Sequence, residues 1–115
     1  CQKQNLPIIP GVMTPSEVSQ AVRHGLKLLK FFPAEAAGGI PFLKALSAPF
    51  GEVRFMPTGG ISPNNVIDNL QLPAVIACGS SWLVKSELLE NERFDEVTQR
   101  VAHAVKLVQQ GGQLE

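Results

Sequence analysis

Short apolar segments, each followed by a turn and then by a stretch with helical spacing, recur along this chain and limit the folds available to it. Four such segments are predicted to be strands, over residues 7–10, 26–32, 53–57 and 74–78. Apolar strands that alternate with helices are typical of a parallel sheet. A length of 115 residues is usual for one domain. We therefore predict an α/β fold of βα units, with residues 1–115 forming a single domain.

Two positions carry the residues of a helix start. Thr14, Pro15 and Glu17 predict a capping box, with Thr14 as the N-cap and Pro15 at the first helical position. Ser62 and Pro63 predict a second helix start of this kind. Further helices are expected over residues 40–48 and 95–109. The last of these repeats apolar residues at helical spacing, and Gly111 and Gly112 mark its expected end.

Lys30 is placed near the carboxyl end of the second predicted strand, which we expect to be buried on both sides. Alternation along the strand puts Leu28, Lys30 and Phe32 on one face. Burial disfavours an ammonium group, and a neutral amine is what Schiff-base chemistry with a carbonyl compound requires. The alternative is a lysine whose amine reaches the surface from a strand end. Because lysines are usually exposed, the pattern alone favours this alternative.

Glycine, threonine and serine residues follow the last two predicted strands, at residues 58–60 and 79–81. The carboxyl ends of parallel strands are where α/β active sites lie. Glycines let backbone N–H groups approach a ligand closely, so the two turns together predict a phosphate-binding site. The alternative is that these glycines serve only tight turns.

Composition gives no indication of binding to nucleic acid, a membrane or a metal ion. The formal net charge is zero, which gives no indication of binding to nucleic acid or to an anionic membrane surface. No apolar run approaches the ~20 residues of a membrane span. Cys1 and Cys78 form neither a disulfide framework nor a metal-ligand cluster. We therefore expect no metal and a cytoplasmic location, and we take the start at Cys1 rather than Met as a sign of a processed or truncated product.

Four motifs carry a resemblance to a known family. The four motifs are KFFPAE at residues 30–35, RFMPTGGISPNN at 54–65, GSSWL at 79–83 and PIIPGVMTPSE at 7–17. Together they closely resemble the 2-keto-3-deoxy-6-phosphogluconate (KDPG) and 4-hydroxy-2-oxoglutarate (KHG) aldolase family. The resemblance implies a class I aldolase on a (β/α)8 TIM barrel, usually a homotrimer. It also implies a keto-acid sugar phosphate as the substrate and no cofactor.

The resemblance also implies roles for individual residues. Lys30 would be the Schiff-base lysine, Phe32 would line the substrate pocket and Thr58 would lie beside the lysine. The residues implied to bind the substrate phosphate are Gly59, Gly60, Gly79, Ser80 and Ser81. The family often has glycine at the position of Ser80, so a hydroxyl here would replace a close backbone approach.

Only about the last four βα units and the C-terminal helix of the family's barrel are matched. The general acid/base glutamate and an arginine that binds the substrate carboxylate belong to the other half, and no motif here corresponds to them. We therefore expect residues 1–115 to be the C-terminal half of an aldolase, inactive alone and prone to self-association. The alternatives are cleavage of KHG by the same lysine, a non-catalytic phosphate-binding half-barrel, and a phosphate-binding barrel enzyme without covalent chemistry. The sugar stereochemistry of the substrate is not specified by these residues.

Overall fold

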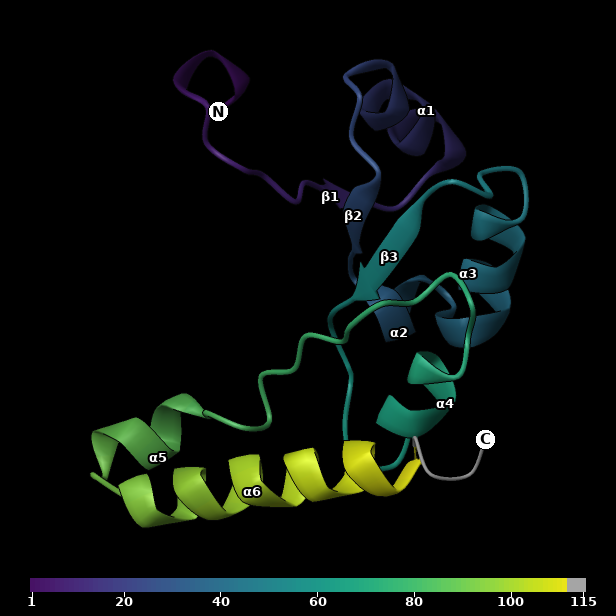
Figure 1. The fold of residues 1–115 in the computed structure, drawn as a ribbon. Helices are drawn as coiled ribbons and strands as arrows, with labels where there is room; N and C mark the ends of the chain where they lie inside the picture. The colour runs from purple at the N-terminus through teal and green to yellow at the C-terminus, as the bar shows by residue number, and fades with distance from the viewer. Residues whose placement is uncertain (112–115) are drawn as a thin grey trace.

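A three-stranded parallel sheet lies at the centre of the computed structural model, which describes residues 1–111 (Figure 1). The strands are β1 (Gly11–Val12), β2 (Leu28–Phe31) and β3 (Arg54–Pro57), in that order across the sheet. Lys30 is in register with Gly11 on one side and with Met56 on the other. The predicted parallel sheet of βα units is therefore confirmed for the second and third strands. The first strand lies just after the predicted residues 7–10, because Pro7 and Pro10 have no N–H group to donate to a sheet.

Helices connect and follow these strands. They are the 3-10 helix η1 (Gln2–Gln4) and the α-helices α1 (Pro15–Arg23), α2 (Ala34–Ala37), α3 (Gly39–Ser47), α4 (Val66–Leu70), α5 (Ser86–Glu90) and α6 (Phe94–Gly111). The capping box of α1 is confirmed, because the Thr14 hydroxyl accepts from Glu17 N and the Glu17 carboxylate accepts from Thr14 N at 2.9 Å. The helices expected over residues 40–48 and 95–109 appear as α3 and α6, whereas α2 and α5 were not predicted. Gly112, expected to help end the last helix, is outside the described residues.

The fourth predicted strand, residues 74–78, is wrong as a regular strand. The segment meets β3 only through isolated parallel bridges, Phe55 with Val75 and Thr58 with Gly79. The physical reason is visible at its outer edge, where Ile76 is 61% exposed and no further strand pairs with it among residues 1–111. A segment paired on one side only in this way lacks half of the hydrogen bonds of a central strand.

The helix start predicted at Ser62 and Pro63 is also wrong, since α4 begins at Val66. The Asn65 side chain accepts a hydrogen bond from Ser62 N at 2.9 Å and donates one to Gly60 O at 3.0 Å. These local bonds hold residues 60–65 as a turn, and such side-chain bonds compete with helix formation.

The core lies on one face of the sheet. Leu29, Phe31 and Phe55 are fully buried there, together with residues from α1 and α3. The opposite face, which carries Lys30 and Met56, is only partly covered. The prediction that the second strand is buried on both sides is therefore wrong within the described part of the chain.

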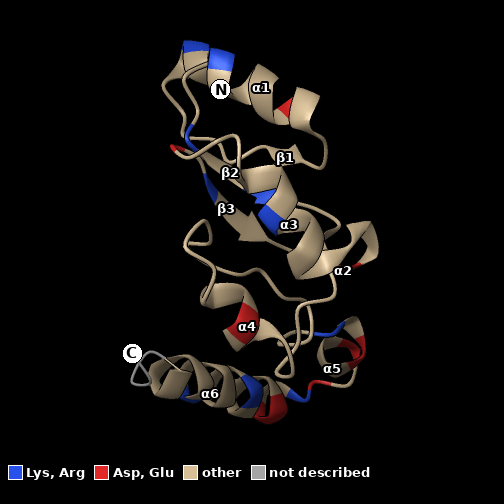
Figure 2. Cartoon of the chain, turned by 90° about the vertical axis from the view of Figure 1, so that its right-hand side faces the viewer, with Lys and Arg blue, Asp and Glu red and all other residues tan. Residues whose placement is uncertain are grey.

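The last helix, α6, lies below α4 and away from the sheet (Figures 1 and 2). None of its residues is buried, and Phe94 and Val105 are 57% and 51% exposed. The apolar face of α6 is thus largely open, and the helix packs mainly against α4, α5 and the loop before α5. No helix among residues 1–111 is both long enough and apolar enough to cross a membrane.

Candidate active site

Lys30 projects from β2 on the open face of the sheet, one residue before the carboxyl end of the strand. Its Nζ lies 4.8 Å from the centroid of the Phe32 ring, within the range of a cation–π contact. The side chain is half-buried. The amine is therefore held beside an aromatic ring, yet a small carbonyl compound can reach it from the open face.

Phe32 and Thr58 lie at the same end of the sheet as this lysine. Phe32 is half-exposed, and its ring also borders Gly59, where an added Cβ would approach ring atoms to 3.3 Å. Thr58 directly follows β3, and its N–H donates to Phe31 O at 2.9 Å. The structure thus brings Lys30, Phe32, Thr58 and Gly59 together at one end of the sheet.

The short helix α2 closes the site on one side. Ala34 N donates to Thr58 O at 2.8 Å, and Glu35 N donates to Gly59 O at 3.1 Å. The first N–H groups of α2 are therefore occupied by the loop after β3. The sequence signal for this helix was the run Ala34–Ala37, whose residues favour helix but span only one turn.

Packing leaves no room for a side chain at two glycines of these loops. Gly60 has φ +79°, and a Cβ there would lie 2.6 Å from both Cβ and Cγ of Glu35. At Gly79 a Cβ would lie 2.6 Å from the Thr58 Oγ1. The loops after β3 and after residue 78 are therefore in close contact, as the parallel bridge between Thr58 and Gly79 also shows.

Ser80 joins the same two loops. Its Oγ donates to Ile61 O at 2.6 Å and accepts from Trp82 N at 3.4 Å. The hydroxyl hydrogen is therefore used between the loops, contrary to the expectation that it would serve a ligand. Sequence reasoning did not identify this link, because nothing in the pattern indicates which carbonyl a serine will reach.

Backbone donors remain at the ends of the two loops. The N–H groups of Gly60, Ser80 and Ser81 have no acceptor among residues 1–111, whereas Gly79 N donates to Pro57 O at 2.9 Å. Ser81 is exposed. Unpaired backbone N–H groups on adjacent loops are suited to an anionic oxygen ligand.

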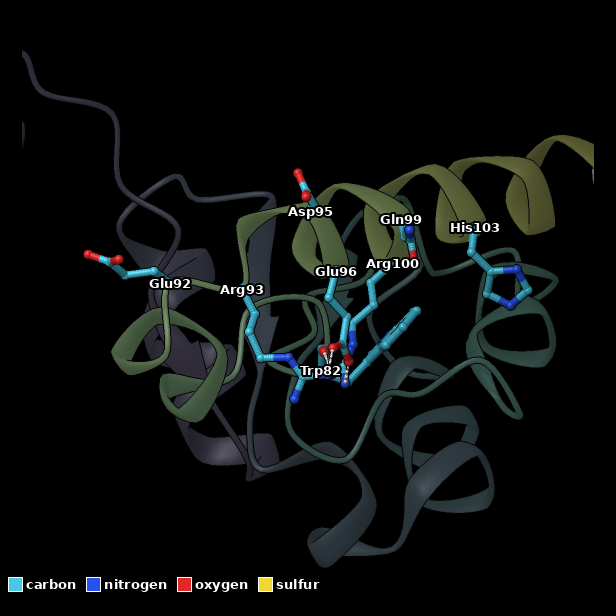
Figure 3. A pocket seen from close by; sticks show the side chains of 8 residues that line it. All are labelled: Trp82, Glu92, Arg93, Asp95, Glu96, Gln99, Arg100 and His103. Carbon is cyan, nitrogen blue, oxygen red and sulfur yellow. Dashed lines mark hydrogen bonds and ion pairs between the residues drawn. The ribbon is translucent and has the colours of Figure 1, made fainter.

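Two hollows lie beside residues 79–83, and Lys30 lines neither of them. One, of about 420 Å³, is mainly apolar and separates α4 from α6. Cys78 lines it, and burial raises the pKa of the Cys78 thiol to about 11. The other, of about 700 Å³, is lined mainly by charged and polar residues and lies along α6 (Figure 3). Within the described residues no group of three or more histidine, cysteine, aspartate or glutamate side chains is arranged to hold a metal ion.

Comparisons with known proteins agree on one family. The sequence pattern of the family described as KDPG and KHG aldolase matches residues 1–100. A KHG/KDPG aldolase from Escherichia coli strain K12 is 48% identical over 101 residues, which cover 88% of this chain and 47% of that protein.

Solved structures give the same result. KDPG aldolase from Legionella pneumophila, with pyruvate captured as a covalent carbinolamine intermediate, superposes with a TM-score of 0.82 at 45% identity, covering 86% of this chain and 48% of that one. The KDPG aldolase of Zymomonas mobilis ZM4 with 3-phosphoglycerate gives a TM-score of 0.72 at 40% identity, covering 74% and 41%. The chain thus spans about half the length of the relatives that it matches.

Proposed function

Since the chain belongs to the KDPG and KHG aldolase family, we propose that the natural protein carrying it is a class I aldolase. It cleaves KDPG to pyruvate and glyceraldehyde 3-phosphate, and Lys30 is its Schiff-base lysine. The observation that carries this proposal is the position of the Lys30 amine, on the open face at a strand end and beside the Phe32 ring. The covalent carbinolamine of pyruvate in the Legionella relative supports it, because an amine adds to a ketone to form such an intermediate.

The proposed reaction follows from the chemistry of a lysine amine. The Lys30 Nζ attacks the ketone carbon of KDPG, and loss of water gives an iminium ion. The iminium accepts the electron pair of the C3–C4 bond when the C4 hydroxyl loses its proton and the aldehyde leaves. The remaining pyruvate enamine is protonated, and hydrolysis releases pyruvate and restores the amine. Phe32 and Thr58 flank the substrate in this scheme.

The phosphate of the substrate would be held by the two adjacent loops. The unpaired N–H groups of Gly60, Ser80 and Ser81 supply the donors. Gly59 and Gly79 contribute by close approach, since Gly79 N–H is already paired with Pro57 O. A relative with bound 3-phosphoglycerate supports a phosphorylated ligand in this family.

The open sheet face leads to a proposal for the whole fold. We propose that residues 1–115 belong to one domain, a (β/α)8 barrel, in which further strands pair with the free edges and cover the face that carries Lys30 and Met56. Those strands also supply the general acid/base group, so residues 1–115 alone turn over no substrate. The complete enzyme is proposed to be a homotrimer, as the family resemblance implies.

A second candidate substrate is KHG, which the family description includes. The same lysine would cleave it, and no phosphate donors would be needed. The ratio of kcat/KM for KDPG to that for KHG in the natural protein decides between the two substrates.

Trapping of the imine tests the assignment of the lysine. Incubation of the natural protein with pyruvate and borohydride should add a reduced pyruvyl group to the peptide that contains Lys30. Lys27 and Lys44 are exposed internal controls, and a Lys30→Arg variant should lose the label. A label on Lys27 or Lys44 would contradict the assignment.

A further inference from the structure

The loop that ends at Trp82 is tied to α6 by one charged side chain. Arg100 Nη1 donates to Trp82 O at 2.7 Å, across 18 residues of sequence. Bonds between a charged donor and a carbonyl are among the stronger hydrogen bonds in proteins. Arg100 is half-buried, so this contact is partly shielded from water.

Glu96 fixes the direction of the guanidinium. Its Oε1 accepts from Arg100 Nη2 at 2.7 Å, one helical turn away on α6. Arg93 pairs with the other oxygen of the same carboxylate. Figure 3 shows Arg93, Glu96 and Arg100 converging beside Trp82, whereas the carboxylates of Glu92 and Asp95 point away. Of these two arginines only Arg100 reaches the loop, because Arg93 ends on Glu96.

The contact continues directly into the proposed phosphate-binding loop. Trp82 N donates to Ser80 Oγ, and Ser80 Oγ donates to Ile61 O. Residues 79–82 are thus held at one end by Ile61 and at the other end by Arg100. No residue of α6 is fully buried, so the helix has no buried apolar side chain to hold it in place.

We propose that Arg100 is a positioning residue, which sets the backbone N–H groups of Ser80 and Ser81 for a phosphate by holding the Trp82 carbonyl. This inference rests on the proposed function of residues 79–81. Arg100 does not touch the substrate; it acts through the loop.

The test compares Arg100→Ala with Arg93→Ala in the natural protein. Both variants remove a cation from Glu96, but only the first removes the bond to Trp82 O. The expected result is a rise of about tenfold in KM for KDPG in Arg100→Ala, since a displaced binding group can cost up to ~100-fold. kcat and the cleavage of KHG should change little, and Arg93→Ala should match the wild type. The KM of Arg100→Lys should lie between those of the wild type and Arg100→Ala, because a lysine amine can reach only one of the two partners at a time.

A binding measurement keeps the inference separate from the aldolase proposal. Isothermal titration calorimetry with inorganic phosphate measures binding to the natural protein without any turnover of substrate. If the wild type cleaves neither substrate, the aldolase proposal fails, and weaker phosphate binding in Arg100→Ala than in Arg93→Ala still supports the positioning role. Equal effects of the two variants, or no phosphate binding by the wild type, would overturn it. Arg100→Gln replaces Arg100→Ala if circular dichroism shows that the alanine variant is unfolded.

Discussion

The two ends of the molecule are built in different ways. Around β1, β2 and β3, large side chains such as Phe31 and Phe55 are completely buried between the sheet and its helices. No side chain of α6 itself is buried, although the helix is the longest described. The first region is a packed core, and the second is a half-open helix whose contacts include the hydrogen bond of Arg100 to Trp82.

The comparison shows that an apolar stripe at helical spacing predicts a helix better than it predicts what covers it. α6 carries the stripe and is helical, but its Val101, Val105 and Val108 are all more than a third exposed. Exposed apolar surface of this kind marks a place where another surface packs. This agrees with the proposal that further parts of a barrel cover the present structure.

The same substitution at the two ends should produce the largest difference. Phe31→Ala removes a fully buried ring that stacks on Phe42 with centroids 5.8 Å apart, and it should lower the free energy of unfolding by about 3–5 kcal/mol. Phe94→Ala removes a ring that is 57% exposed, and its effect should stay within about 0.5 kcal/mol. Urea denaturation of both variants measures the difference.

Protein concentration sharpens this comparison. If Phe94→Ala destabilises the protein only at high protein concentration, then a second copy of the chain covers α6. The predicted difference between Phe31→Ala and Phe94→Ala would then still hold within a single chain. A large loss at every concentration would contradict the view that α6 contributes little to the core.

Two glycines with nearly equal φ angles allow a crowded position to be compared with an open one. Gly60 has φ +79° and Gly25 has φ +78°, but a Cβ would collide with Glu35 at the first and meet nothing within 4 Å at the second. Alanine at either position must adopt an unfavourable left-handed conformation, which costs about 1–2 kcal/mol. Gly60→Ala should cost about 1–3 kcal/mol more, because overpacking adds to that strain. Equal unfolding free energies for the two variants would mean that Glu35 moves aside freely.

Much of the first region could be predicted from sequence because its signals are local. Alternation placed Lys30 and Leu29 on opposite faces of β2, and the residues Thr14 and Glu17 formed the expected capping box. The predicted neighbourhood of the two glycine-rich turns is also seen, in the bridge between Thr58 and Gly79.

The errors depend on contacts that a local pattern does not contain. Ser62 and Pro63 have the composition of a helix start, but the Asn65 side chain captures Ser62 N and holds a turn. The segment around Ile76 has strand composition, but its outer edge has no partner among the described residues. The link from Arg100 to Trp82 spans 18 residues and leaves no periodic signal.

The smallest predicted effect concerns the start of α1. α1 has a full capping box, whereas α2, α3, α4 and α5 have no side-chain cap. Hydrogen bonds from the Thr14 side chain, and then from the backbone N–H groups of Met13 and Thr14, hold the pKa of Glu17 below its ordinary value of 4.5. The unfolded chain therefore binds this proton more readily, so the contribution of Glu17 is fully present above about pH 4.5 and is lost as the pH falls through the lower folded pKa. Unfolding measured from pH 7 to pH 3 should show a smaller acid-induced loss for Glu17→Gln than for the wild type, and an intermediate loss for Thr14→Val. Identical pH profiles for all three proteins would show that the cap binds Glu17 no better when it is charged.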